Sequence, residues 1–236
     1  MTDPVNTYGQ PLGAPISGWT PRPLPVHVHL PGRYCRVEPL DVARHADDLY
    51  AAYAEAPDER DWTYLFTNKP TDRAAFGEWV SMVSKVADPL QFAIVDAVSG
   101  KALGTAALMR IDPQHGVIEI GGITYSRRLQ KHRAGTEAMY LLMRHAFDDL
   151  GYRRYEWKCD SRNERSIVAA KRYGFTFEGI FREVIVYKGR NRDTAWFSII
   201  DSEWPGVKAA FERWLSEDNF DAAGRQKRSL GSLRGA

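Results

Sequence analysis

A run of basic residues leading into a predicted helix is the segment of this sequence best suited to chemistry. Lys131, His132 and Arg133 stand just before Gly135, from which an apolar pattern predicts a helix to Leu150. A helix start presents unpaired amides and a partial positive charge that attract phosphate oxygens, and glycine lets backbone approach a ligand closely. Basic side chains oppose the dipole at a helix start, which favours a bound anion. A solvated loop whose charges face water explains the same residues.

A carboxylate on the strand before this loop is a candidate general base. Glu119 alternates with Ile118 and Ile120 along a predicted strand at 117–125, so it faces away from their apolar side. An amine is protonated near pH 7 and must lose a proton before it can attack a carbonyl carbon, and a carboxylate can accept that proton. An exposed Glu paired with a cross-strand Arg or Lys is the alternative, and the residues alone favour it.

Three further groups are weaker candidates. His27 and His29 have His-x-His spacing but no carboxylate cluster, and a proline-rich segment is a poor metal cage. Cys159 fits a buried, inert thiol on a strand face. An aromatic group could line a substrate pocket or belong to the core, and both readings stay open: Trp62, Tyr64, Phe66 and Trp79. Walker A and G-x-G-x-x-G patterns are absent, which disfavours nucleotide hydrolases and Rossmann enzymes.

Strands and helices that would position these residues follow from periodicity and turn signals. Helices are expected from Asp41 to about Ala54, after Thr71, from Gly135, from Ser161 to Gly174, and around Val207 to Leu215. The expected strands cover 34–40, 92–96, 101–111, 117–125, 154–159, 175–187 and 194–201, with 188–193 as a polar hairpin loop. This order predicts one α+β domain around a mixed, mostly antiparallel sheet.

Composition divides the chain into three parts and excludes several classes of protein. Seven of the 13 prolines fall within residues 1–31, so 1–32 is expected to be an extended arm, 33–203 the domain, and 204–236 a helix with a basic tail. After Asp221 there are four bases and no acid, so the preceding residues carry a net charge of −2; the tail is expected to be frayed and solvated, and nucleic-acid binding is disfavoured. The 44% apolar and 26% charged residues indicate a folded, water-soluble chain without a membrane span. With two cysteines and no signal-peptide pattern, the expected location is the cytoplasm.

Several motifs together resemble the GNAT N-acetyltransferases, and within them the branch of ribosomal-protein N-terminal acetyltransferases. They are Glu119 to Tyr125, Gln130 to Ala138, and Asn163-Glu164-Arg165-Ser166 leading into Arg172-Tyr173-Gly174-Phe175. The resemblance covers about residues 33–200. It implies a GNAT fold in which two parallel strands, 117–125 and 154–159, splay apart and hold acetyl-CoA between them.

The resemblance also implies which residues bind the cosubstrate. Backbone amides at the start of the helix would bind the pyrophosphate, and this role falls on Lys131, His132, Arg133, Ala134, Gly135 and Thr136. Ile123, Thr124 and Tyr125 would give main-chain hydrogen bonds to the pantetheine, Asn163 would contact it, and Arg172 would reach a phosphate. A glycine of the family pattern falls on Arg133, which could contact phosphates directly.

The same resemblance makes the chain an acetyl-CoA-dependent N-acetyltransferase that works by direct transfer to an amine, without a metal. Glu119 would be the base. The tyrosine that protonates the departing thiolate in many relatives falls on Ala170, and Ser166 is the hydroxyl that the closest branch suggests instead. The alternative is a non-catalytic acyl-CoA-binding or regulatory module. The acceptor (a protein N-terminus or a small-molecule amine) and the oligomeric state are open, and the 175–201 hairpin could pair in a homodimer.

Overall fold

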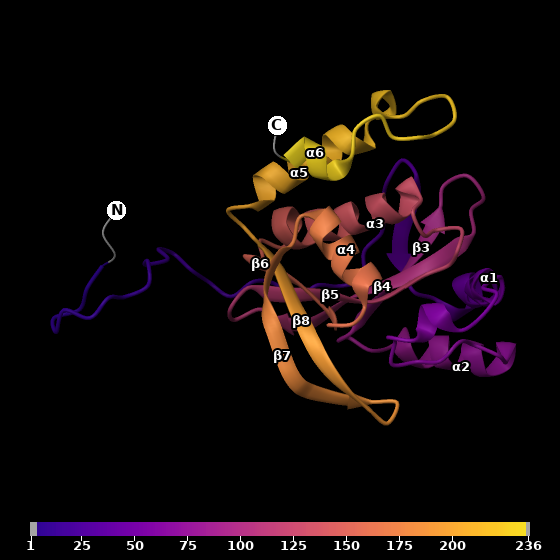
Figure 1. The fold of residues 1–236 in the computed structure, drawn as a ribbon, viewed down its shortest axis with the longest axis horizontal. Coiled ribbons are helices and arrows are strands. Elements are labelled where there is room, and N and C mark those ends of the chain that lie inside the picture. Colours follow the sequence, from indigo (N-terminus) through magenta and orange to yellow (C-terminus); the bar gives the residue numbers. More distant parts are fainter. Residues whose placement is uncertain (1–3, 235–236) are drawn as a thin grey trace.

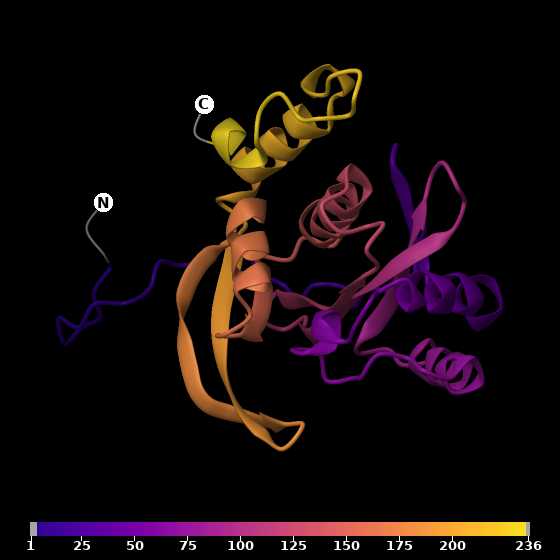
Figure 2. The same cartoon turned by 45° about the vertical axis from the view of Figure 1, so that its right-hand side comes forward.

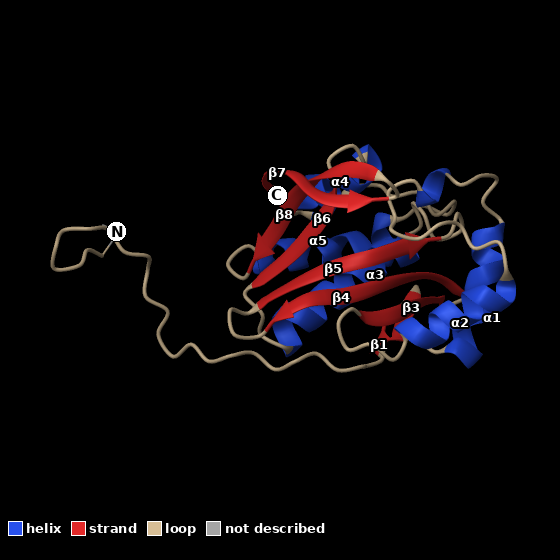
Figure 3. Cartoon of the chain, turned by 90° about the horizontal axis from the view of Figure 1, so that it is seen from below, coloured by secondary structure: helices blue, strands red, loops and turns tan. Residues whose placement is uncertain are grey.

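The computed structural model describes residues 4–234 and contains one eight-stranded mixed sheet with helices on both faces (Figures 1 and 3). The strand order is β1-β2-β3-β4-β5-β6-β8-β7, and each neighbouring pair is antiparallel except β5 and β6. The predicted α+β class is confirmed. None of the helices in the described residues is both long and apolar enough to cross a membrane.

Most elements fall where periodicity predicts them. The strands are β1 (Leu30–Pro31), β2 (Cys35–Pro39), β3 (Leu90–Asp96), β4 (Ala102–Asp112), β5 (Val117–Tyr125), β6 (Arg154–Asp160), β7 (Thr176–Tyr187) and β8 (Arg190–Ile200). The helices are α1 (Val42–Ala54), α2 (Arg73–Val83), α3 (Arg133–Arg144), α4 (Glu164–Tyr173), α5 (Trp204–Leu215) and α6 (Leu230–Arg234), with short turns at Arg60–Trp62 and Glu217–Asn219. A π-helical turn, His145–Asp149, extends α3 towards its predicted end.

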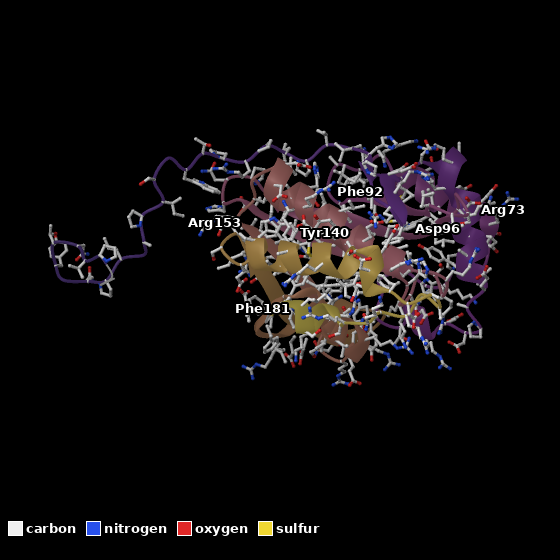
Figure 4. The ribbon with its side chains drawn as sticks, turned by 90° about the horizontal axis from the view of Figure 1, so that it is seen from above. Arg73, Phe92, Asp96, Tyr140, Arg153 and Phe181 are labelled. Atoms are coloured by element: carbon white, nitrogen blue, oxygen red, sulfur yellow. The ribbon has the colours of Figure 1, made fainter. Side chains whose placement is uncertain are left out.

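Two layers of helices bury the two faces of the sheet. On β3, Ala93 and Val95 pack into a cluster with α1 and α2, whereas Phe92 and Ile94 join the larger core under α3. The larger core continues to α5, which lies beside α3 (Figure 2). Tyr140 of α3, labelled in Figure 4, stacks on Phe211 of α5 with the ring centres 5.6 Å apart. Successive side chains of a strand point to opposite faces of the sheet, so the same strands contribute residues to both cores.

The parallel strands β5 and β6 separate part of the way along, and this positions the site. Their pairing ends at Ile120 and Trp157, although β5 runs on to Tyr125 and β6 to Asp160. A register shift against β4 gives β5 a bulge at this point, where Gly122 has φ +57°. A bulge bends the strand that carries it, and β8 holds β6 along its whole length. The two strands therefore diverge at their carboxyl ends, as predicted.

Local hydrogen bonds correct several predicted boundaries. Asp41 caps α1 as predicted, but Asp72 rather than Thr71 caps α2, and Asn163 rather than Ser161 caps α4. Regular structure begins at β1, just before the predicted strand. The hairpin loop between β7 and β8 is Lys188-Gly189 alone, since β8 already starts at Arg190.

The two ends of the chain behave differently. The first part of the predicted arm extends away from the body, and the rest crosses it (Figure 1). There the guanidinium carbon of Arg153, the residue just before β6, lies 5.8 Å from the centre of the Trp19 ring (Figure 4). The prediction of a frayed tail is wrong for the described residues. Leu230 and Leu233 of α6 are buried against the core, because the tail carries apolar residues at helical spacing that the charge count overlooks.

Five apolar side chains of the edge strand β7 are exposed: Phe177, Ile180, Phe181, Val184 and Val186. The homodimer expected through this hairpin stays a prediction.

Candidate active site

The loops after β5 and β6 meet where these two strands separate. Main-chain acceptors of β5 at this opening already have partners: the Tyr53 hydroxyl donates to the Thr124 carbonyl oxygen at 3.0 Å, and Gln130 Nε2 donates to that of Tyr125 at 2.9 Å. Ile123 lies in the bulge of the same strand and is half-buried. Side chains therefore hold this stretch of β5 in place, and a carbonyl oxygen has a second lone pair for a ligand.

The basic loop ends at the start of α3, where the anion-site hypothesis places the ligand, and a side chain already caps this helix. Lys131 is exposed with φ +58°, and His132 is the N-cap of α3, where its Nδ1 accepts a hydrogen bond from the Ala134 amide at 3.3 Å. The first-turn amides of a helix have no intrahelical partner. Ser126, at the start of this loop, is buried with a hydroxyl that has no partner in the described residues.

Arg133 does not point its charge into this loop. Its guanidinium carbon lies 4.4 Å from the centre of the Tyr34 ring and 5.3 Å from that of Phe220. A cation over aromatic faces is held by the ring quadrupoles. The suggestion that the Arg133 side chain contacts phosphates directly is therefore corrected; its main chain stays in the first turn of α3.

Gly135 is required for internal packing rather than for the approach of a ligand. A Cβ at this position would lie 2.8 Å from the Tyr125 ring and 2.9 Å from the Leu129 carbonyl oxygen. The Tyr125 hydroxyl also donates to the Gly135 carbonyl oxygen at 2.9 Å. The glycine thus locks the helix start against the end of β5.

Two residues predicted to contact phosphates come together at the same helix start. Arg172, near the end of α4, donates from Nη1 to the Thr136 hydroxyl oxygen at 3.1 Å. Its guanidinium carbon also lies 5.0 Å from the Trp214 ring. A permanent cation is therefore placed beside the amides of α3.

Glu119 is buried, with 2% of the residue exposed, and lies between two cations. Arg110 Nη1 donates to its Oε1 at 2.7 Å, and Lys158 Nζ lies 2.9 Å from its Oε2. Arg110 reaches it because β4 is bulged there and Arg110 has φ +47°, a conformation that is uncommon outside glycine. Glu119 is therefore ion-paired as in the alternative prediction, but it is not exposed.

The ion pairs continue across β6 as a ladder. Lys158 Nζ also lies 2.7 Å from Glu156 Oε2, and Arg154 Nε donates to Glu156 Oε1 at 2.6 Å. Arg154 pairs in addition with Glu178 of β7, and its hydrogen bonds hold the pKa of Glu178 below its usual value. Alternation places these side chains on the face of the sheet opposite α3 and α4.

One oxygen of Glu119 keeps an open acceptor position. Lys158 Nζ forms an ion pair with the buried Oε2, which has no further partner in the described residues. The Lys158 side chain is only 9% exposed, and its Nζ lies 3.8 Å from the centre of the Trp196 ring. The carboxylate can therefore accept one more hydrogen bond, from water or from an amine.

Ser166 and Asn163 lie at the start of α4, on the other face of β6. The Asn163 side chain accepts a hydrogen bond from the Ser166 amide at 3.2 Å, and the Ser166 hydroxyl oxygen accepts one from Trp157 Nε1 at 2.9 Å. Burial raises the pKa of the nearby Cys159 thiol, and a hydrogen bond from Ser166 lowers it in part. Cys159 is a free, buried thiol, as predicted.

Two other positions on α4, Ala170 and Tyr173, are packed into the core. Ala170 is fully buried, and Tyr173 stacks on Phe211 at 6.0 Å. Burial also raises the pKa of Tyr173. Ser166 is therefore the α4 hydroxyl near the separated strands.

The aromatic group is divided between core and surface. Trp62 is buried and meets Tyr53 edge-on at 6.0 Å, and Trp79 stacks on Phe76 at 5.6 Å, so both belong to the core. Phe66 is 59% exposed and packs against Tyr187 of the hairpin. His27 meets Phe92 edge-on at 5.9 Å, and no metal-binding group of three or more His, Cys, Asp or Glu side chains occurs within residues 4–234.

Some residues at the opening give no sequence signal. Asp61 pairs with Arg127 at 2.7 Å and with Arg165 at 3.0 Å, and so joins the loop after β5 to the start of α4. These partners are about 65 and 100 residues away in the chain, so no spacing rule connects them. Lys158 could have been found, because it shares a predicted strand face with Glu156.

Comparison with known proteins agrees with this geometry. The family description "Acetyltransferase (GNAT) domain" matches residues 36–176. The chain resembles the crystal structure of a GCN5-related N-acetyltransferase from Brucella melitensis, with 51% identity and a TM-score of 0.92 over 94% of this chain and 100% of that one. It also resembles a probable GNAT-family acetyltransferase from Chromobacterium violaceum, with 36% identity and a TM-score of 0.76 over 86% and 100% of the two chains. A curated relative, the uncharacterized N-acetyltransferase p20 of Bacillus licheniformis, is 29% identical over 116 residues, which are 49% of this chain and 65% of that protein.

Proposed function

The chain belongs to the GNAT acetyltransferase family, and we propose that it transfers the acetyl group of acetyl-CoA directly to a primary amine, with Glu119 as the general base. The observation that carries the proposal is the buried carboxylate with one open acceptor position beside the separated strands. Acetyl-CoA supplies a thioester whose carbonyl carbon is open to attack by an amine.

The residues at the opening fit acetyl-CoA. β5 has no pairing to β6 beyond Ile120, so an extended pantetheine chain can lie along it as a strand would. The amides of α3 and the Arg172 guanidinium suit a pyrophosphate, and the unpartnered Ser126 hydroxyl is a further donor at the loop.

Glu119 would take the proton of the attacking amine through Oε2, directly or through one water. Arg110 is 47% exposed on its side chain and can move, whereas Lys158 is confined between the two glutamates. An approaching ammonium is attracted to the carboxylate and loses its proton to it before or during attack. Arg110, through Oε1, and Lys158 would keep the carboxylate in place while Oε2 takes up the proton.

Ser166 would donate a hydrogen bond to the departing thiolate. Its oxygen already accepts from Trp157, which fixes its position, and its proton can turn from the Cys159 thiol towards the departing thiolate. The CoA thiolate is a fair leaving group, so this contribution is modest, about 1.5–3 kcal/mol for a hydrogen bond to a charged atom.

A thiol-release assay with a panel of primary amines tests the proposal. We expect CoA release that depends on the amine and falls when Glu119 is changed to Gln. Saturable acetyl-CoA binding without CoA release from any amine would contradict it and favour a non-catalytic binding module.

A further inference from the structure

The arm that precedes β1 exposes apolar side chains and carries no charge in its first part. Residues 4–21 include no Asp, Glu, Lys, Arg or His. Four apolar side chains of this stretch are exposed: Val5, Tyr8, Leu12 and Ile16. Segments that stay solvated are typically rich in charge and poor in apolar and aromatic residues. The composition of the arm therefore indicates a segment that packs against protein.

The tip of the arm has a structure of its own. The Leu12 amide donates to the Pro4 carbonyl oxygen at 2.7 Å and closes a loop. Inside this loop, Asn6 Oδ1 accepts from the amides of Tyr8 at 2.9 Å and Gln10 at 3.0 Å. Within residues 4–234, no hydrogen bond joins 4–18 to the body of the protein. The tip thus presents its apolar side chains in a preformed shape, which lowers the entropic cost of binding.

A latch just behind the tip fixes the arm to the body. Trp19 Nε1 donates to the Gln114 carbonyl oxygen at 3.1 Å, and the Arg22 amide donates to that of Pro113 at 2.9 Å. The Arg22 guanidinium carbon also lies 4.4 Å from the centre of the Trp19 ring. From this latch, the arm leaves the body on the side where β7 forms the edge of the sheet (Figures 1 and 2). Residues 12–18 can extend about 20 Å beyond the latch.

The edge strand β7 is a second apolar surface, and its shape favours an irregular partner. Its pairing with β8 shifts register between Phe177 and Gly179 and again between Phe181 and Ile185. Bulges of this kind hinder the pairing of an edge with another regular strand. Two β7 strands are therefore poorly suited to form a continuous ladder with each other, whereas a proline-containing arm that packs through its side chains needs no ladder.

We propose that a second copy of this chain covers both surfaces, with the arm of each protomer packed on β7 of the other. A twofold dimer makes this contact twice and buries all four surfaces. The 13 residues at 4–16 and the 12 residues of β7 are together 25, and a standard interface takes about 20–30 residues a side. To reach its own β7, the arm would have to turn back behind the latch at Trp19.

The first test is the oligomeric state of the full chain by analytical ultracentrifugation at increasing concentration. The wild-type protein should sediment as a dimer at micromolar concentration. Tyr8→Asp, at a side chain that is 87% exposed, and Val186→Asp, at one that is 80% exposed, should each weaken the dimer at least about 30-fold. Val98→Asp is the matched control, because Val98 is equally exposed but lies in the turn between β3 and β4. It should leave the dimer unchanged.

The second test identifies which surfaces meet. Both native cysteines are buried, so a bis-maleimide should react only with an introduced thiol. When Tyr8→Cys chains are mixed with Val186→Cys chains, the reagent should join one chain of each kind. Val98→Cys chains in place of Val186→Cys chains should give no such product.

Three results would overturn the inference, and none of them depends on acetyl transfer. A monomer at every concentration means that no second copy covers these surfaces. A dimer that neither Tyr8→Asp nor Val186→Asp weakens must form through another face. A monomeric chain that carries both Tyr8→Cys and Val186→Cys and is linked within itself would place the arm on its own β7.

Discussion

Replacing Glu119 by Gln distinguishes a general base from a residue whose only role is a structural ion pair, because the change keeps the shape of the side chain and removes its charge. The carboxylate is buried and has Arg110 and Lys158 as partners. Breaking a buried pair typically costs about 3–5 kcal/mol, since it leaves an uncompensated charge. Here Lys158 keeps Glu156 at 2.7 Å, and Arg110 is 47% exposed to water. We therefore expect the free energy of unfolding to fall by only about 1–3 kcal/mol.

The effect on catalysis should be much larger. Loss of a general base typically lowers turnover about 10²- to 10⁴-fold, while acetyl-CoA affinity holds. The acidic limb of the pH profile of kcat/KM should vanish together with the carboxylate.

Glu156→Gln is the matched control for this change. Glu156 is opposite Glu119 in the strand register, is similarly buried and shares Lys158. It should lose comparable stability in urea unfolding and keep its turnover to within a few-fold. If the two variants lose turnover equally, or if Glu119→Gln keeps wild-type turnover and an unaltered profile, Glu119 is a structural residue only.

Three further predictions concern the cosubstrate, the leaving group and the pH range of stability. Lys131→Glu puts a negative charge in the exposed loop before α3 and should weaken acetyl-CoA binding by about 5- to 150-fold; unchanged affinity by calorimetry, with the fold intact, would remove the anion site. Ser166→Ala should slow turnover roughly 10- to 150-fold at constant CoA affinity, whereas normal turnover, with Tyr173→Phe as the slow variant, would move the proton donor to the end of α4. Burial lowers the pKa of His45, so below about pH 6.5 the unfolded chain binds a proton that the folded chain does not. The free energy of unfolding therefore decreases as the pH decreases. His45→Gln should flatten the difference in urea unfolding between pH 7.5 and 5.5, and an unchanged difference would assign it to other groups.

Periodicity and turn signals predicted seven of the eight strands and the helices α1 to α5, but not β1 or α6. Strict alternation at 154–159 gave β6, and the apolar pattern after Gly135 gave α3, because these patterns reflect burial on one face. Helix caps were less predictable, since Thr71 and Asp72 are both good capping residues and only the backbone decides between them. The prediction of a frayed tail was wrong because it considered only the basic charges and not the helical spacing of Leu230 and Leu233.

The candidate site was predictable where one segment carries it and not where the fold assembles it. The basic loop and α3 are contiguous, so their proximity needs no tertiary information. The partners of Glu119 come from β4 and β6, and Asp61 reaches its partners from a distant loop. Long-range ion pairs depend on register and on bulges such as that at Arg110, which are set by the folded sheet.

The arginine at position 133, where the family pattern has glycine, packs against the C-terminal segment. A long side chain at the start of α3 would crowd phosphates if it lay in the loop. It is drawn away because Phe220 and Tyr34 form an aromatic pair, with ring centres 6.5 Å apart, that receives its guanidinium. Phe220 in turn meets Trp214 of α5 edge-on at 5.2 Å. Both C-terminal rings lie beyond residues 36–176, the part that matches the family. The departure from the family pattern is therefore accommodated by a segment outside the family domain, which keeps the Arg133 side chain away from the start of α3.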